Sequence, residues 1–352
     1  MKNLLIQFDQ SLKNALKQLN KSGEKCLVVV DINEKFLGTL SDGDVRKAIL
    51  DRKGINQSIQ PIFNKNSTYL LKGEYSKKEV KDIFVKNKFD LIPIVDKSGK
   101  IVDILIWAKI FGNGKNRKTD SLSAPVVIMA GGKGARMEPF TKVLPKPLIP
   151  VHDKTIIEHI IERFNVLGCT DFYLTVNYKS KIMKAFFEEL EPNYKVHFVD
   201  EQVPLGTGGS LGLLKGRINQ PFFVSNCDII INSDYWSLYE FHQKGGYDVT
   251  VVASAKEYII PYGTCELNGD GHLSHINEKP KYDFLINTGL YVLNPKMIDL
   301  IPEKKFYHIT HLIEDAKNLG FKVGVYPIDD DSWIDVGQWA EYKKAAERLN
   351  LY

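Results

Sequence analysis

Short apolar runs alternate with amphipathic stretches from residue 126 onward. The runs that predict strands are Val126–Ala130, Phe172–Val176, Val196–Val199, Phe222–Cys227 and Val249–Ala253. Apolar residues at helical spacing predict helices over Thr155–Leu167 and Lys181–Leu190. Such continuous apolar runs are typical of parallel strands covered on both faces, so this region is predicted to form an α/β domain with a mostly parallel, Rossmann-like sheet. Ligands of such sheets bind at the carboxyl ends of the strands.

The front of the chain contains one hydrophobic pattern twice. Val28–Asp31 and Phe36–Leu40 reappear, with an offset of 65 residues, as Pro93–Asp96 and Ile101–Leu105. The helix-like segments that precede the copies are Ser11–Leu19 and Ser76–Val85. A unit of two strands and flanking helices is too small to be stable alone, so we expect the two copies to pack together in one α+β module.

A polar, glycine-bearing segment over 112–123 separates these two patterns. At 352 residues, the chain is long enough for about two domains, each with a core of its own. We therefore expect one domain over 1–118 and a second over 124–352.

The overall charge of +4 hides a difference between the two regions. Residues 1–118 carry 23 Lys and Arg against 13 Asp and Glu, whereas the remainder carries 24 against 30. The front lysines are dispersed along helix-like stretches, which indicates a solvated surface and not a nucleic-acid interface. No segment approaches the roughly 20 apolar residues of a membrane span, and the start lacks a signal-peptide core, so we expect a cytoplasmic protein.

Four cysteines are scattered singly through apolar runs. They are Cys26, Cys169, Cys227 and Cys265. This spacing predicts buried thiols and neither a disulfide framework nor a zinc site.

The predicted strand Val126–Ala130 breaks into a glycine-rich, basic loop. Its glycines are Gly131, Gly132 and Gly134. They would let backbone N–H groups approach phosphate oxygens, while Arg136 and Lys146 add cationic donors. The loop lacks both the third glycine of a dinucleotide-binding turn and the Gly-Lys-Ser/Thr of a P-loop. It therefore predicts nucleotide chemistry of a different kind.

Two carboxylates stand at positions suited to a metal. Asp228 follows directly after the predicted strand Phe222–Cys227, and Asp335 lies between apolar residues in Trp333–Gly337. Chemistry on the phosphates of a nucleotide builds up negative charge that cationic side chains alone rarely neutralise. Mg²⁺ prefers carboxylate ligands, and the carboxyl end of a buried strand is where such sheets place their sites, so Asp228 is a candidate ligand and Asp335 a second acid to consider beside it.

These motifs, in this order over roughly residues 124–345, resemble those of the sugar-1-phosphate nucleotidylyltransferases. The loop matches the family pattern at Gly131, Gly132, Gly134, Arg136, Met137, Pro139, Thr141, Pro145, Lys146 and Pro147. The resemblance implies a nucleotidyltransferase fold and the joining of a nucleoside triphosphate to a sugar 1-phosphate with release of pyrophosphate. It also implies that Arg136, Lys146 and Asp228 are catalytic, and that Asp228 and Asp335 bind Mg²⁺.

The same resemblance assigns the substrate contacts. The implied nucleotide-binding residues are Gly131, Gly132, Gly134, Glu201, Gly206 and Thr207, and the implied sugar-phosphate residues are Gly263, Glu278, Lys279, Asn287 and Thr288. The carboxylate of Glu201 suits guanine, which exposes two adjacent donors, and this favours GTP. The neighbouring Gln202 would suit uracil or thymine, so uridylyl or thymidylyl transfer stays open.

The front module resembles a tandem pair of CBS motifs, which bind adenosine nucleotides and related ligands. Ser41 and Asp44 match the positions that hold a ribose in that family, whereas Ile106 and Lys109 stand at the equivalent positions of the second copy. The resemblance therefore implies one adenosine or guanosine nucleotide per pair. A regulatory and a dimerising role are both open, and we expect homo-oligomers formed through these modules.

With the CBS pair included, the architecture is most similar to that of the glucosamine-1-phosphate guanylyltransferases of bacterial legionaminic acid biosynthesis. The expected product is then GDP-glucosamine, with mannose 1-phosphate and heptose 1-phosphate as alternative acceptors. A non-catalytic nucleotide sensor is the alternative from another functional class. The presence of Arg136, Lys146, Asp228 and Asp335 argues against it.

Overall fold

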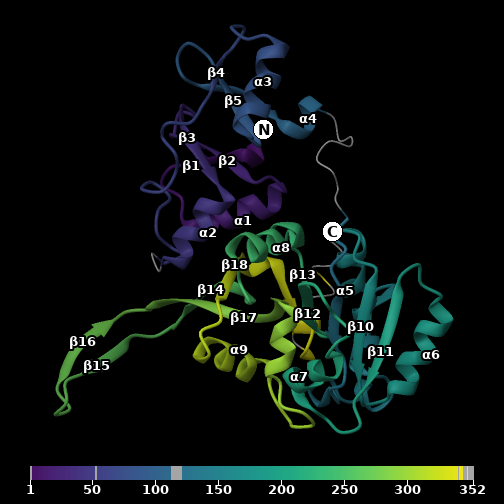
Figure 1. The fold of residues 1–352 in the computed structure, drawn as a ribbon. Coiled ribbons are helices and arrows are strands. Elements are labelled where there is room, and N and C mark those ends of the chain that lie inside the picture. Colours follow the sequence, from purple (N-terminus) through teal and green to yellow (C-terminus); the bar gives the residue numbers. More distant parts are fainter. Residues whose placement is uncertain (1, 52–53, 112–120, 340, 344–346, 348–352) are drawn as a thin grey trace. The chain divides into compact units, whose positions relative to one another are not determined.

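The structure is a computed structural model that describes residues 2–51, 54–111, 121–339, 341–343 and 347. The chain divides into two compact units (Figure 1). The first comprises Met1–Thr119, Ser254–Ile286 and Pro327–Asp330, and the second comprises Asp120–Ala253, Asn287–Tyr326 and Asp331–Tyr352. Most of the segment 112–123, where the sequence predicts a linker, lies outside the described residues.

The front of the first unit contains two three-stranded sheets of the same design. The elements of the first copy are β1 (Leu5–Gln7), α1 (Leu12–Ser22), β2 (Cys26–Val30), β3 (Phe36–Ser41) and α2 (Asp42–Leu50). Those of the second are β4 (Leu70–Leu71), α3 (Lys77–Asn87), β5 (Leu91–Val95), β6 (Ile101–Ile106) and α4 (Trp107–Phe111). In each copy the middle strand is parallel to the first strand and antiparallel to the third.

The two copies agree in detail. The register of β2 against β3 shifts between Val29 and Val30, and that of β5 against β6 shifts between Ile94 and Val95, at equivalent places in the repeat. Side chains of both copies also lie in one hydrophobic cluster, with Leu40 from the first and Ile104 from the second. The expectation that the copies pack on a shared core is therefore confirmed.

The second unit is built on a seven-stranded sheet with the order β11-β10-β7-β12-β17-β14-β18. Its strands are β7 (Val126–Met129), β10 (Asp171–Val176), β11 (Lys195–Asp200), β12 (Phe222–Asn226), β14 (Val249–Ile259), β17 (Lys281–Leu293) and β18 (Val323–Asp329). β11, β10, β7 and β12 are parallel, as predicted, whereas β17 is antiparallel to β12. The sheet is therefore mixed, and β14, β17 and β18 continue into the first unit.

Helices cover both faces of this sheet. They are α5 (Ile156–Asn165), α6 (Ser180–Leu190), α7 (Gly206–Gly209), α8 (Tyr235–Gly245) and α9 (Ile309–Asn318). On β12, Phe223 contacts the rings of Phe164 and Tyr235, while the next residue, Val224, packs in a cluster with Leu312. Successive strand residues point to opposite faces, so both faces are buried, which explains the unbroken apolar runs.

Three short antiparallel strand pairs complete the described part of the chain. They are β8 (Pro150–Val151) with β9 (Lys154–Thr155), β13 (Ile229–Ile231) with β19 (Trp333–Asp335), and β15 (Thr264–Leu267) with β16 (Leu273–Asn277). Within the described ranges, no helix combines the length and the apolar character that crossing a bilayer requires.

The cysteines differ in exposure. Cys169 is buried, and Cys26 and Cys227 are half-buried, but Cys265 on β15 is exposed. The prediction of a buried thiol is therefore wrong at Cys265, because β15 and β16 form a two-stranded ribbon whose faces are open.

Candidate active site

A cavity of about 450 Å³ lies at the carboxyl ends of β7, β10 and β12. Its lining residues, all in the second unit, are Met129, Gly131, Gly132, Gly134, Ala135, Arg136, Lys146, Thr175, Glu201, Pro204, Gly206, Thr207, Ser210, Asn226, Cys227, Asp228 and Phe306. This volume is within the usual range for small-molecule sites. The structure thus brings together at one cavity all the residues predicted to be catalytic and all those predicted to bind the nucleotide.

The glycine loop forms one wall of the cavity, and side-chain hydrogen bonds fix its backbone. The Thr141 hydroxyl donates to the carbonyl of Gly134 at 3.1 Å, and the Tyr178 hydroxyl donates to the carbonyl of Thr141 at 3.1 Å. Arg136 lies in a short 3-10 helix, Ala135–Met137, and its exposed side chain borders the cavity. The loop therefore offers backbone donors and one cation to an anionic ligand.

Lys146 and Asp228 form an ion pair in the cavity wall. The ammonium group of Lys146 donates to Oδ2 of Asp228, and the two side chains are 8% and 17% exposed. Lys146 belongs to the 3-10 helix Lys146–Leu148 and Asp228 follows β12. Two segments distant in the sequence thus bring opposite charges together in a largely desolvated place, where electrostatic interactions are stronger than in water.

The pairing of β13 with β19 brings Asp335 close to the ion pair of Lys146 and Asp228. Ile229 is opposite Asp335, and the N–H of Val336 donates to the carbonyl of Asp228 at 2.9 Å. A Cβ atom on Gly337 would lie 2.7 Å from Oδ1 of Asp335, 2.9 Å from Oδ2 of Asp228 and 3.1 Å from the Lys146 ammonium. The absence of a side chain at Gly337 is therefore required for two carboxylates and one lysine to meet there.

Glu201 lies deeper in the cavity, just after β11. It is 9% exposed, and its carboxylate accepts a hydrogen bond from the N–H of Leu205 at 2.9 Å. Burial raises the pKa of this carboxyl above its ordinary value, although the hydrogen bond from Leu205 opposes the shift. A Cβ atom on Gly131 would overlap with its Oε1 atom, so the glycine loop and Glu201 are in direct contact.

The Gly206–Gly209 turn is fixed to the start of α9. The N–H groups of Gly208 and Gly209 donate to the carbonyl of Tyr307 at 2.9 and 2.8 Å, and Thr207 accepts at its hydroxyl from the N–H of Ile309 at 3.1 Å. From this turn and the residue after it, Gly206, Thr207 and Ser210 line the cavity.

Comparison with known proteins assigns this arrangement to a family. Residues 125–350 match the model of the family described as nucleotidyl transferase, and residues 2–51 match the CBS domain model. The chain belongs to the nucleotidyl transferase family. The fold prediction, a nucleotidyltransferase sheet preceded by a CBS domain, is thereby confirmed.

Curated relatives of this nucleotidyl transferase carry related names. Mannose-1-phosphate guanyltransferase of Pichia angusta is 37% identical over 227 residues, which are 60% of this chain and 60% of that relative. The protein of the same name from Saccharomyces cerevisiae is 35% identical over 228 residues, or 60% and 61% of the two chains. The chain thus spans about 60% of the length of these relatives.

Among solved structures, HddC from Yersinia pseudotuberculosis is similar with a TM-score of 0.51 and 27% sequence identity. The similarity covers 64% of this chain and 99% of HddC. HddC has also been solved complexed with GMP-PN, and that structure is similar with a TM-score of 0.51 at 26% identity.

Sequence reasoning missed several residues that line the cavity of this nucleotidyl transferase. Within the described residues, the hydroxyls of Thr175 and Ser210 are buried, have no hydrogen-bond partner and belong to residues of the cavity wall. Thr175 stands inside a predicted core strand and Ser210 follows a glycine-rich turn, so no pattern in the sequence marks either as a residue of the cavity. Phe306 and Asn226 also border the cavity, and no sequence signal marked them.

The predicted sugar-phosphate residues fall into two groups. Gly263, Glu278 and Lys279 belong to the first unit, where a Cβ atom on Gly263 would lie 3.0 Å from a carboxylate oxygen of Glu278. Asn287 and Thr288 belong to the second unit and do not line the cavity described above. Asn287 donates to the Tyr291 hydroxyl at 2.9 Å, which uses its amide within the protein.

Thr288 has a structural partner. It is buried, and its hydroxyl donates to the carbonyl of Val252 on β14 at 2.9 Å. The side chain of Thr288 therefore joins β17 to β14, and a contact to a ligand would have to come from its backbone.

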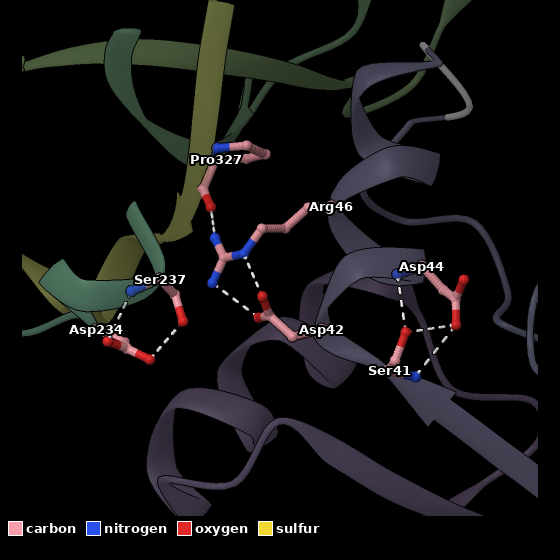
Figure 2. A network of polar contacts seen from close by, with 7 residues as sticks. All are labelled: Ser41, Asp42, Asp44, Arg46, Asp234, Ser237 and Pro327. Atoms are coloured by element: carbon pink, nitrogen blue, oxygen red, sulfur yellow. Dashed lines mark hydrogen bonds and ion pairs between the residues drawn. The ribbon is translucent and has the colours of Figure 1, made fainter. Parts of the chain in front are cut away.

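The two residues predicted to bind a nucleotide in the CBS module form a helix cap (Figure 2). The Ser41 hydroxyl lies 2.5 Å from Oδ2 of Asp44 and accepts from the N–H of Asp44 at 3.2 Å, which makes a capping box at the start of α2. Arg46 donates to both oxygens of Asp42 at 2.7 and 2.8 Å one turn further on. Ser41 and Asp44 thus lie side by side with a role in stability as well as a predicted role in binding.

Proposed function

We propose that this nucleotidyl transferase transfers GMP from GTP to a sugar 1-phosphate and releases pyrophosphate. The observation that carries the proposal is the convergence of Lys146, Asp228 and Asp335 around Gly337, beside the cavity that Lys146, Asp228, the glycine loop and Glu201 line. Relatives named mannose-1-phosphate guanyltransferases and the similarity to HddC support it.

The chain's own side chains would act by positioning and by charge. An oxygen of the sugar phosphate attacks the α-phosphorus of GTP. The bond from the α-phosphorus to the oxygen it shares with the β-phosphorus breaks, and pyrophosphate leaves with that oxygen. This displacement needs no protein nucleophile, so Arg136 and Lys146 contribute by neutralising charge that develops on the phosphates. The backbone N–H groups of the glycine loop would hold the triphosphate in line.

The two carboxylates fit a divalent cation. Asp228, which lines the cavity, and Asp335 each have an oxygen atom within 2.9 Å of the place that a Cβ atom on Gly337 would take, and hard cations prefer such ligands. Nucleotidyltransferases of this family typically use a divalent metal, and we propose Mg²⁺ for this chain. When bound, it supplies further neutralisation of phosphate charge.

Glu201 supports guanine as the base. An ionised carboxylate only accepts hydrogen bonds, and guanine presents two adjacent donors, whereas uracil and thymine present a single donor between two acceptors. UTP or dTTP remains the alternative donor, because Gln202 is adjacent and an amide suits those bases.

Two acceptors are favoured by different observations. The architecture with a CBS pair favours glucosamine 1-phosphate and hence legionaminic acid biosynthesis, whereas the names of the relatives favour mannose 1-phosphate. We propose glucosamine 1-phosphate as the first acceptor to test, with mannose and heptose 1-phosphates next. For the sugar phosphate, Gly263, Glu278, Lys279, Asn287 and Thr288 stay as predicted contacts on the resemblance alone, with Lys279 as the cation that would neutralise the phosphate.

For the front module, residues 1–118, we propose a tandem CBS pair that binds one adenosine or guanosine nucleotide at Ser41 and Asp44. The match of residues 2–51 to the CBS domain supports this assignment. Regulation of the transferase and assembly into homo-oligomers are the two roles such a module would serve.

The test is a screen for pyrophosphate release with four nucleoside triphosphates against a panel of sugar 1-phosphates. We expect release with GTP and glucosamine 1-phosphate, and none from the matched Asp228→Asn variant. Faster release with UTP or dTTP would overturn the base assignment. No release with any pair, together with nucleotide binding, would favour the non-catalytic sensor.

A further inference from the structure

Phe306 places an aromatic ring at the border of the active-site cavity. Among the described residues that line this cavity it is the one aromatic side chain, and it is 62% exposed. A single exposed hydrophobic residue is common on protein surfaces and by itself needs no function to explain it. Phe306 differs from such a residue because it borders a cavity of ligand size and because its backbone is held in a fixed position.

Hydrogen bonds join the backbone next to Phe306 to the turn that follows Glu201. The N–H of Tyr307 donates to the carbonyl of Leu205 at 2.8 Å, and the carbonyl of Tyr307 accepts from two N–H groups of the turn Gly206–Gly209. The side chain of Tyr307 is buried and packs in the core of the second unit. The backbone therefore presents the exposed ring at a defined place before any ligand arrives.

That place is close to the carboxylate of Glu201. The N–H of Leu205 donates to this carboxylate at 2.9 Å. On the next residue, Gly206, a Cβ atom would lie 3.4 Å from Cε2 of Phe306. The ring and the carboxylate thus flank the same two residues of backbone at the cavity.

A neighbouring histidine fixes the orientation of the ring. The rings of Phe306 and His308 meet edge-on, with centroids 4.9 Å apart and planes at 84°. His308 in turn meets the ring of His311 at 5.3 Å. An edge-on contact covers at most one of the two faces of a ring, and Phe306 is mostly exposed, so a face of its ring stays open for stacking.

The charge near the ring suits a base better than a phosphate. The turn Gly206–Gly209, beside which the ring lies, carries no charged side chain, and the two lysines before Phe306 are not among the described residues that line the cavity. The cationic side chains that line it are those of Arg136 and Lys146. A phosphate is held by such cations and by backbone donors, whereas an uncharged aromatic ring attracts the flat face of a base.

We propose that Phe306 stacks on the base of the donor nucleotide while Glu201 binds the edge of the same base. This inference rests on the proposed function, in which a nucleoside triphosphate occupies the cavity. Every base has a flat π face, so stacking adds affinity without selecting a particular base. Phe306 therefore determines how strongly a base is held, and Glu201 determines which base is preferred.

The first test is Phe306→Ala, with Phe284→Ala as the matched control. Phe284 is 50% exposed and lies on β17 in the first unit, away from the cavity. We expect the KM for GTP to rise roughly five-fold or more in Phe306→Ala, which is the effect of losing one base–aromatic stack. The change should fall on KM and much less on kcat, because stacking is the same before and during the reaction. Phe284→Ala should leave the KM unchanged.

Two further variants separate stacking from simple apolar contact. Phe306→Tyr keeps the aromatic face and should keep the KM for GTP close to that of the wild type. Phe306→Leu keeps an apolar side chain without an aromatic face, and it should resemble Phe306→Ala. The ring is exposed, so none of these changes removes core packing.

Inorganic tripolyphosphate is the matched ligand control, because it offers phosphates without a base. As a competitor of GTP it should inhibit the wild type and Phe306→Ala with the same inhibition constant. The KM for glucosamine 1-phosphate should also be the same in the two proteins. Calorimetric titration with GTP in the absence of a sugar phosphate gives the affinity independently of turnover.

Four results would overturn the inference. Equal weakening of GTP and tripolyphosphate in Phe306→Ala would show that the ring shapes the cavity and does not contact the base. A rise in the KM for the sugar phosphate alone would assign the ring to the acceptor. Unchanged GTP affinity in Phe306→Ala would overturn this inference and leave the proposed function intact, whereas a wild type that binds no nucleoside triphosphate would overturn both.

Discussion

The ammonium group of Lys146 donates a hydrogen bond to the carboxylate of Asp228 within the wall of the active-site cavity. Asp335 lies nearby, on the other side of Gly337, so two carboxylates stand close to one lysine. A divalent cation that binds Asp228 competes with Lys146 for the same oxygen atoms. The ion pair is therefore expected to keep metal affinity low until a nucleotide brings further negative charge.

Replacement of Lys146 by methionine tests this competition. Lys146→Met leaves the two carboxylates without a compensating charge. The attraction between an ammonium group and a carboxylate in contact is worth a few kcal/mol at the effective dielectric of a protein. We expect Mn²⁺ to bind the nucleotide-free protein roughly ten-fold more tightly or better, measured by electron paramagnetic resonance. Lys154→Met is the control, because Lys154 pairs with Glu162 at an exposed site. Unchanged Mn²⁺ affinity in Lys146→Met would contradict the competition.

The two acids are expected to be indispensable for turnover. Asp228→Asn and Asp335→Asn each remove a metal-binding charge without changing size, and stabilisation by a metal is worth several kcal/mol, so kcat should fall by about 10³-fold or more. Asp171→Asn is the control, since Asp171 begins β10 and is far from its carboxyl end. Steady-state rates at saturating Mg²⁺, with circular dichroism to verify folding, provide the measurement. Full activity in either variant would remove that acid from the mechanism.

Glu201 is expected to set the preference for guanine. A hydrogen bond to a charged group is worth about 1.5–3 kcal/mol, so Glu201→Gln should reduce the preference for GTP over UTP and dTTP roughly ten-fold or more. Competition between triphosphates in a pyrophosphate-release assay gives the ratio. A wild-type enzyme that already prefers UTP or dTTP would show that the carboxylate does not recognise guanine.

The raised pKa of Glu201 predicts a dependence on pH. Desolvation favours the neutral carboxyl, so Glu201 gains its proton at a higher pH than an ordinary glutamate and then no longer accepts from the guanine N1–H. The KM for GTP should therefore rise as the pH falls from 7 toward 5. In Glu201→Gln, which has no ionisable group at this position, the KM should stay flatter over the same interval. Parallel profiles for the two proteins would exclude Glu201 as the titrating group.

The CBS module is expected to hold one nucleotide per chain through Asp44. Asp44→Ala should abolish binding of AMP or GMP to the full chain in calorimetric titration, but it also removes a capping box, worth about 0.5–2 kcal/mol of stability. Glu79→Ala is the matched control, because Ser76 and Glu79 form a capping box of the same kind at the start of α3, where no nucleotide site is predicted. Two sites per chain, or equal losses of binding in both variants, would contradict the one-site prediction.

The sequence predicted five of the seven strands of the sheet, β7, β10, β11, β12 and β14, because each contains an apolar run, whereas it did not predict β17 and β18. It predicted Asp228 for a similar reason, since a polar residue directly after a buried strand stands at the edge where ligands bind. The meeting of Asp228 with Asp335 was implied only by resemblance. It depends on the pairing of β13 with β19, two three-residue strands about a hundred positions apart, which no local pattern indicates.

Other features had no sequence signal of their own. Thr175 alternates with core residues along β10, so its burial was predictable but its place in the cavity wall was not. Cys265 stands among residues with a strand pattern, and such a pattern does not reveal whether anything packs against the strand. Exposure of the side chains between residues 258 and 285 follows from the long-range course of β14, which continues beyond its predicted end at Ala253 into the first unit, and of β17, which the sequence did not predict.

The contact between Gly131 and Glu201 limits how this enzyme can evolve. Residue 131 belongs to the loop that would hold the triphosphate and residue 201 to the site that would select the base, yet a single methyl group on Gly131 would collide with the glutamate. A lineage that changes its preferred nucleotide can therefore replace Glu201 only by a residue no larger than glutamate, unless the glycine loop at Gly131 moves first. The isosteric exchange Glu201→Gln is the simplest open path, and directed evolution toward another base is expected to begin with it.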